Sequence, residues 1–108
     1  MPLRAAPAVD NPLLERHAAR LIQLRNWDAA RAALHALARQ RPGDPGRRAQ
    51  LAYVRGQQAA TAGDFAAARR AWRDALQLDP ALADAHIALR TLPRPPAGWR
   101  RLWRRLTS

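Results

Sequence analysis

Apolar side chains recur at helical spacing along most of the chain, and short polar turns separate the successive runs. The clearest run covers residues 65–78, where apolar positions in steps of three and four are interspersed with arginines. Asp64 offers a side-chain oxygen to the free amides of the first turn, and Gly63 permits a sharp turn before it. Pro80 forces Asp79 out of the helical region. The pattern therefore predicts a helix that ends just before Asp79 and forms half of a helix–turn–helix pair.

Four further helices are predicted from the same spacing and from the caps and prolines between the runs. Their expected ranges are Pro12 to about Leu24, about Trp27 to Gln40, about Pro45 to Ala62, and Ala81 to Leu92. We expect Asp79 and Pro80 to cap and open the last of these helices, because proline is well tolerated at the first helical position. The whole pattern predicts an all-α fold in which neighbouring helices pair.

The two ends of the chain have a different character. Residues 1–10 are expected to be a flexible leader, and residues 93–96, which hold three prolines, a linker. Residues 97–108 place Trp99, Leu102, Trp103 and Leu106 at i, i+3, i+4 and i+7, with arginines on the opposite side. This spacing predicts a short, basic, amphipathic C-terminal helix.

Small, aromatic and proline residues of the second helix pair fall in a specific register. The residues that define this register are Ala52, Gly56, Ala59, Gly63, Phe65, Ala68, Trp72, Ala75 and Pro80. Together they resemble the signature of a tetratricopeptide repeat, in which small residues lie where two helices cross and aromatics fill the gap. The resemblance covers residues 49–82, although the family more often carries Trp and Tyr at the positions of Ala52 and Ala59. The first helix pair matches the second at an offset of 38 residues, against a family period of about 34. The extra residues are expected between Gly43 and Arg48, and the third helix is expected to be longer than the first.

The resemblance implies two tetratricopeptide-like antiparallel helix hairpins in a short right-handed solenoid, followed by a capping helix and the amphipathic C-terminal helix. The helical domain would cover residues 11–92, with repeat one at about 11–42, repeat two at about 45–80 and the capping helix at about 80–92. The function that it implies is a non-catalytic protein–protein interaction module, a small adaptor or assembly factor. Such a module binds a peptide or partner protein through its concave helix surface.

Carrying the family positions over one at a time gives ten groove residues. They are Glu15, Ala19, Ile22, Gln23, Gln50, Tyr53, Gln57, Thr61, Asp84 and Ile87. Some family members hold a peptide's terminal carboxylate with paired Lys, Asn and Arg side chains. Here those positions are Glu15, Ala19, Tyr53 and Gln57, so that carboxylate clamp is missing.

The charge leaves a second reading open. The net charge is +11, and six arginines without a single acid lie from Arg90 onward. Such a balance favours an anionic membrane, a nucleic acid or an acidic protein as partner. The residues that would carry membrane-surface or nucleic-acid binding are those of the basic tail, Trp99, Arg100, Arg101, Trp103, Arg104 and Arg105. The alternative is a purely structural role, in which the tail packs as a degenerate third repeat.

Size makes that alternative relevant, because arrays of this type generally need about three repeats to bury their apolar faces. Three solutions exist: the tail completes a third repeat, two chains self-associate, or a partner protein covers an open end. We favour the first, with self-association second.

Several function classes are excluded by what the sequence lacks. Cysteine is absent, so disulfides, thiol catalysis and cysteine zinc sites are excluded. His17, His35 and His86 lie on three different predicted helices, without metal-binding spacing. We expect no enzyme activity, cofactor, metal site or small-molecule substrate. No apolar run reaches signal-peptide or membrane-spanning length, so a cytoplasmic protein is expected.

Overall fold

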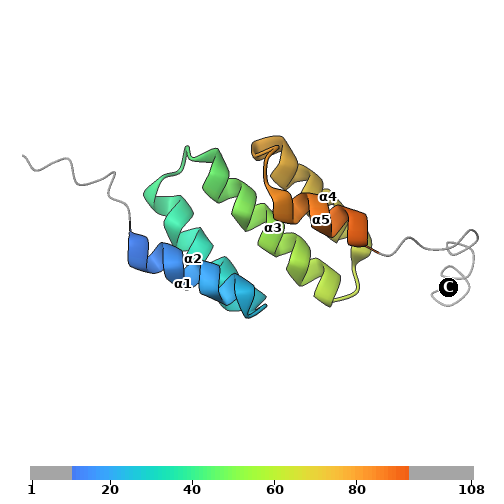
Figure 1. Ribbon diagram of the computed structural model, residues 1–108, viewed down its shortest axis with the longest axis horizontal. Coiled ribbons are helices and arrows are strands. Elements are labelled where there is room, and N and C mark those ends of the chain that lie inside the picture. The colour runs from blue at the N-terminus through green and yellow to red at the C-terminus, as the bar shows by residue number, and fades with distance from the viewer. Residues whose placement is uncertain (1–10, 93–108) are drawn as a thin grey trace, which may run out of the picture.

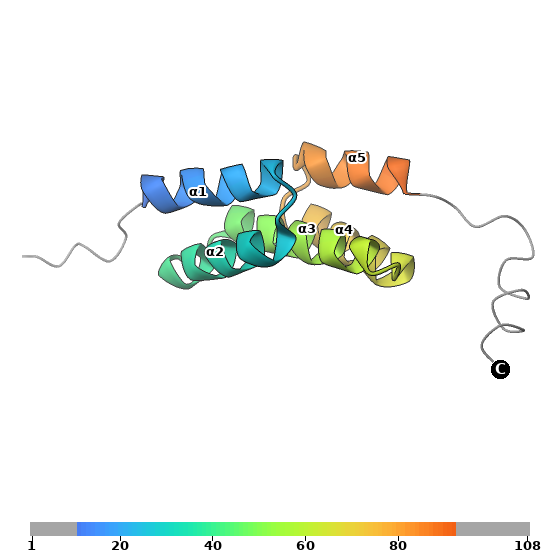
Figure 2. The ribbon, with the colours of Figure 1, turned by 90° about the horizontal axis from the view of Figure 1, so that it is seen from below.

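A computed structural model of the chain describes residues 11–92, and these residues form five helices. The helices are α1 (Pro12–Gln23), α2 (Trp27–Gln40), α3 (Pro45–Thr61), α4 (Phe65–Leu78) and α5 (Ala83–Thr91). They pack in chain order as adjacent antiparallel pairs, α1 on α2, α2 on α3, α3 on α4 and α4 on α5 (Figure 1). In Figure 2, α1 and α5 lie on the same side of a layer that contains α2, α3 and α4. The all-α prediction is confirmed for this part of the chain.

Four of these helices begin where the sequence places a capping side chain. In each case a side-chain oxygen of the capping residue accepts from a backbone amide of the first turn. The bonds are Leu14 to Asn11 (3.1 Å), Ala29 to Asn26 (3.4 Å), Gly46 to Asp44 (2.9 Å) and Ala67 to Asp64 (3.1 Å). Each satisfies an amide that the helix leaves without an internal partner, which stabilises a helix by about 1 kcal/mol. Local sequence therefore determines where α1 to α4 start.

The start of α5 differs from the prediction. The amide of Asp79 donates to the carbonyl of Ala75 at 2.9 Å, so Asp79 is the final cap of α4. Its side chain accepts from the amide of Ala81 at 3.1 Å and its carbonyl from Leu82 at 3.1 Å, which makes a turn. The prediction that Asp79 and Pro80 open the next helix was therefore wrong. The helix begins at Ala83, after a residue without a capping side chain.

The two hairpin turns have the same construction, 38 residues apart. In the first turn three backbone amides donate to carbonyls of α1: Leu24 to Arg20, Arg25 to Ile22 and Asn26 to Leu21. In the second turn the corresponding bonds to α3 are Ala62 to Gln58, Gly63 to Ala60 and Asp64 to Ala59. Helices α2 and α4, which follow these turns, each contain 14 residues. Helix α3 contains 17 residues and α1 contains 12, so the longer third helix is confirmed. The offset of 38 residues read from the sequence therefore equals the spacing of these two turns.

The middle residue of each turn has left-handed backbone geometry, with φ of 58° at Arg25 and 84° at Gly63. Only glycine adopts this geometry without a steric cost of about 1 kcal/mol. Arg25→Gly is therefore expected to raise the free energy of unfolding by about 0.5–1 kcal/mol, and Gly63→Ala to lower it by a similar amount. Urea denaturation of the two variants measures both changes. A lower stability for Arg25→Gly would contradict the matched turns.

A glycine and a tryptophan meet where α4 packs on α3. The indole Nε1 of Trp72 donates to the carbonyl of Tyr53 at 3.2 Å, inside the core. A methyl group built on Gly56 would lie 2.3 Å from that same nitrogen. Gly56 therefore gives the indole the space it occupies, as the small-residue pattern predicts.

The core is thin and rich in alanine, and it continues through all five helices. Its buried members are Ala18, Ala30, Ala33, Leu34, Leu37, Tyr53, Val54, Ala68, Trp72, Ala75, Ala85, Ala88 and Leu92. Trp27 packs its ring edge-on against Tyr53, with centroids 6.2 Å apart. Phe65 holds the matching position in the second hairpin and stays 41% exposed. The aromatic start of the second hairpin thus remains partly uncovered within residues 11–92.

Candidate functional site

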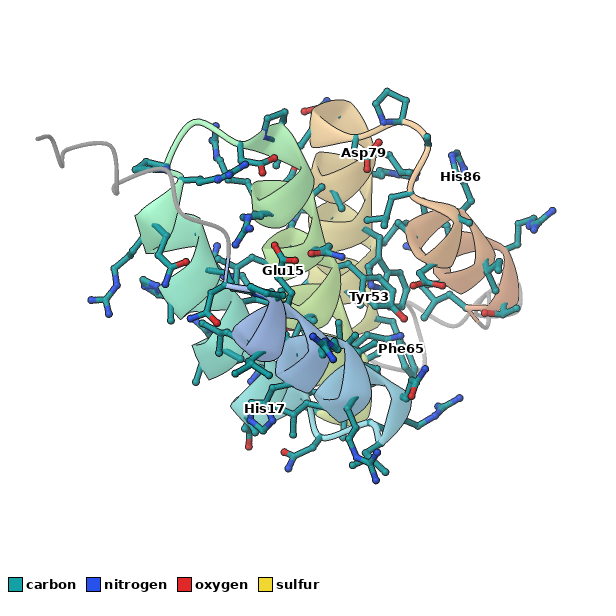
Figure 3. The ribbon with its side chains drawn as sticks, turned by 60° about the vertical axis from the view of Figure 1, so that its left-hand side comes forward. Glu15, His17, Tyr53, Phe65, Asp79 and His86 are labelled. Carbon is teal, nitrogen blue, oxygen red and sulfur yellow. The ribbon has the colours of Figure 1, made fainter. Side chains whose placement is uncertain are left out.

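A cleft of about 640 Å³ opens between α1, the end of α2, the start of α3 and the start of α5. We call it the inner cleft. Its lining includes six of the ten predicted groove residues, namely Glu15, Ala19, Ile22, Gln23, Gln50 and Asp84. Figure 3 shows Glu15 reaching from α1 toward α3, with Asp79 at the far end of the same side. The prediction therefore placed residues from three separate helices around one opening.

The other four predicted groove residues lie elsewhere. Tyr53 is buried, and its hydroxyl accepts a hydrogen bond from the side-chain Nε2 of Gln57 at 2.6 Å. Thr61 lines a shallow hollow beside the first turn, together with Arg25. Ile87 is 48% exposed and lines another hollow on the outer side of α5. All four residues lie on α3 or α5, two of the helices that border the inner cleft, but their side chains do not line it.

Arg47 also lines the inner cleft, and sequence reasoning missed it. Its guanidinium pairs with Glu15 on α1 and with Asp44 before α3, the second contact at 3.4 Å. It also donates to the carbonyl of Leu37 at the end of α2, at 3.4 Å. The residue is only 8% exposed. One side chain thus joins three helices, and its charge is already matched by two carboxylates.

The inner cleft is acidic although the chain as a whole is basic. Residues 11–92 contain seven carboxylates, and four of them line this one cleft: Glu15, Asp44, Asp79 and Asp84. Of the arginines in the same range, Arg41 and Arg47 line it. Beneath the carboxylates lie the buried side chains of Ala18, Leu34 and Leu37. An apolar floor below an acidic rim suits a ligand that carries apolar and cationic groups.

Tyr53 connects the electrostatics of α5 to the core. Burial raises the pKa of its phenol and the hydrogen bond from Gln57 lowers it, while the charge of Asp84 raises it and the charge of Arg25 lowers it. The net direction is upward, because removing a phenolate from water outweighs the bond that would stabilise it. The charge of Asp84 on α5 thus influences the pKa of a buried residue of α3.

This shift predicts a loss of stability at alkaline pH. Below about pH 10 the phenol is neutral in the folded and unfolded chain, and its contribution is fully present. As the pH rises through 10 toward the raised pKa, the unfolded chain loses this proton first, so the free energy of unfolding falls. Urea denaturation at increasing pH measures the decline. Tyr53→Phe should remove it, and because the chain has one tyrosine, tyrosinate absorbance reports this group alone.

Other sequence candidates add no second site among residues 11–92. No group of three or more His, Asp or Glu side chains in this range has the arrangement of a metal site. None of the described helices is long and apolar enough to cross a membrane. The residues of the basic tail, Trp99, Arg100, Arg101, Trp103, Arg104 and Arg105, lie outside the described part of the chain, as do the predicted leader and linker.

No protein-family model, curated protein or solved structure matches this chain. The inner cleft is therefore the feature that indicates a function. Its position, its carboxylates and the engagement of Arg47 are the observations that carry it.

Proposed function

We propose that this protein is a small tetratricopeptide-like interaction module, an adaptor or assembly factor without catalytic activity. Its two hairpins would form a short right-handed solenoid, with α5 as the capping helix. The observation that carries this proposal is the inner cleft, where residues from α1, α3 and α5 line a single opening. Clefts between helices are common ligand sites in helical proteins. The matched turns and the Gly56–Trp72 crossing support the repeat architecture.

The charges of the inner cleft narrow the chemistry of the partner. A peptide that presents its terminal carboxylate would need a free cation, whereas Arg47 is held by Glu15 and Asp44 and Arg41 is engaged as well. Asp79 and Asp84 add negative charge to the rim, and no ion pair joins either of them to another residue in 11–92. The partner segment should therefore carry arginine or lysine beside apolar side chains. Such a segment would bury its apolar groups on the floor and place its cations at the rim.

A random-peptide display selection against the full-length protein tests this proposal without assuming a partner. We expect the recovered peptides to be rich in cationic and apolar residues. Their affinity should fall at least about tenfold on Gln50→Lys/Asp84→Lys, which places two cations in the inner cleft, as expected for like charges placed opposite a ligand. The matched control is Asp74→Lys/Gln77→Lys, which changes the same residue types at exposed positions of α4.

Two results would contradict the proposal. One is a selection that recovers no binding peptide. The other is equal loss of affinity in the cleft variant and in the α4 control, because then only the overall charge matters. Binding of nucleic acid or anionic vesicles that disappears when the tail arginines are replaced would instead support the membrane-surface or nucleic-acid reading. Such binding should weaken steeply with added salt.

A further inference from the structure

Two openings of different charge border α5. The inner cleft reaches its start, where Leu82 precedes the helix, Asp84 lies in its first turn and Asp79 lies in the turn before it. The outer side of α5 forms a separate hollow that includes Ala83, Ile87, His86 and Arg90 and contains no carboxylate. The chain leaves α5 at Leu92 and continues for sixteen residues. Residues 93–108 therefore follow a helix that borders an acidic cleft at its start and a hollow without carboxylates on its outer side.

The C-terminal segment has the composition that the inner cleft favours. Residues 97–108 contain four arginines, two tryptophans, two leucines and no acid. Against the outer side of α5 these arginines would meet Arg90, a like charge. Against the inner cleft they would meet the carboxylates of Asp79 and Asp84, and the apolar residues would meet the floor at Ala18 and Leu37. Charge complementarity therefore selects the cleft side.

We propose that residues 97–108 occupy the inner cleft of their own chain and compete there with the external partner. The proposal rests on the proposed function, since it assigns an occupant to the same cleft. Its consequence is self-inhibition: a partner must displace the chain's own segment before it binds.

The chain is long enough to make this contact within one molecule. Helix α5 has nine residues, which at 1.5 Å per residue is about 14 Å. The four residues 93–96 span about 13 Å when extended, at about 3.3 Å per residue. The segment that follows them can therefore run back along α5 to its start, where the cleft lies. A tethered segment also has an effective concentration near the millimolar range, which favours its own cleft over that of a second copy.

A spin label at the C-terminus tests the contact directly. The chain has no cysteine, so Ser108→Cys gives a single attachment site in the full-length protein. In the ¹⁵N-labelled protein, we expect the label to broaden the amide signals of Gly46, Gln50 and Asp84 around the inner cleft. A mixed sample, with the label and the ¹⁵N on different molecules, should lose that broadening. The variant Gln50→Lys/Asp84→Lys should lose it within one molecule.

Two results would overturn the proposal: broadening that persists in the mixed sample, or no broadening of any amide in 11–92. Affinity provides the second readout. Replacing Arg100, Arg101, Arg104 and Arg105 by glutamine should strengthen binding of a selected peptide about tenfold, as the fraction of open clefts rises. An unchanged affinity would also overturn self-inhibition. Each of these results leaves the peptide-binding function standing, because that function is tested by the cleft variant and its α4 control.

Discussion

Replacing Gly56 by alanine is expected to destabilise the protein by about 2–3 kcal/mol, the cost of forcing extra volume into a packed core. The added methyl group would lie 2.3 Å from Nε1 of Trp72 and 2.5 Å from its Cδ1, well inside van der Waals contact. The indole cannot turn away easily, because its Nε1 donates to the carbonyl of Tyr53. Helices α3 and α4 must separate instead. In a domain of this size we expect Tm to fall by about 10–20 °C, measured by circular dichroism.

Two further variants show whether the clash is the cause. Gly43→Ala adds the same methyl group in open space, with no atom within 4 Å, and should change the stability by less than about 0.5 kcal/mol. Trp72→Leu makes room for the methyl group, so adding Gly56→Ala to it should cost much less than in the native chain. If Gly56→Ala costs the same with and without Trp72, the crossing is not packed as described.

Arg47→Met is the second large effect, and we expect it to lower the free energy of unfolding by about 2 kcal/mol. Methionine keeps the buried apolar stem but removes the guanidinium that joins Glu15, Asp44 and the carbonyl of Leu37. The expected cost is below that of breaking a wholly buried ion pair, because both carboxylates remain partly accessible to water. Urea denaturation measures the change.

The neighbouring residue provides the control for Arg47. Arg48 is exposed on the same helix, so Arg48→Met removes an equal charge without removing these contacts, and should change the stability by less than about 0.5 kcal/mol. Salt adds a second comparison, since buried pairs are screened less than exposed ones. The difference between native protein and Arg47→Met should therefore persist at high salt. Equal effects of the two substitutions would show that Arg47 acts only through net charge.

The features that sequence predicted well are local ones. Asn11, Asn26, Asp44 and Asp64 cap the helices that they precede, because a cap and its amide partners lie within three residues of each other. The predicted start of α5 was wrong because an Asp-Pro dipeptide such as Asp79-Pro80 can either end one helix or open the next. The structure uses it for the first role, and the reversal of direction then requires a turn before α5.

The candidate site was only partly predictable, for a physical reason. Helical spacing shows which side of a helix a residue is on, but not how deep it lies once the helices pack. Tyr53 is therefore on a cleft-bearing helix yet buried, while Ile87 lies past the rim on the outer side of α5. The pairing of Arg47 with Glu15 joins residues 32 positions apart, and nothing local signals it. The repeat offset of 38, in contrast, was visible because matched residues repeat along the chain.

We propose above that the inner cleft is the surface that binds a cationic, apolar peptide. The most direct measurement is a titration of the ¹⁵N-labelled full-length protein with a peptide from the display selection, followed residue by residue. We expect the amide signals of Ala19, Gln23, Gln50 and Asp84, on α1, α3 and α5, to shift together as peptide is added. Shifts confined to the exposed positions of α2 and α4, such as Arg31, His35 and Arg73, would contradict it.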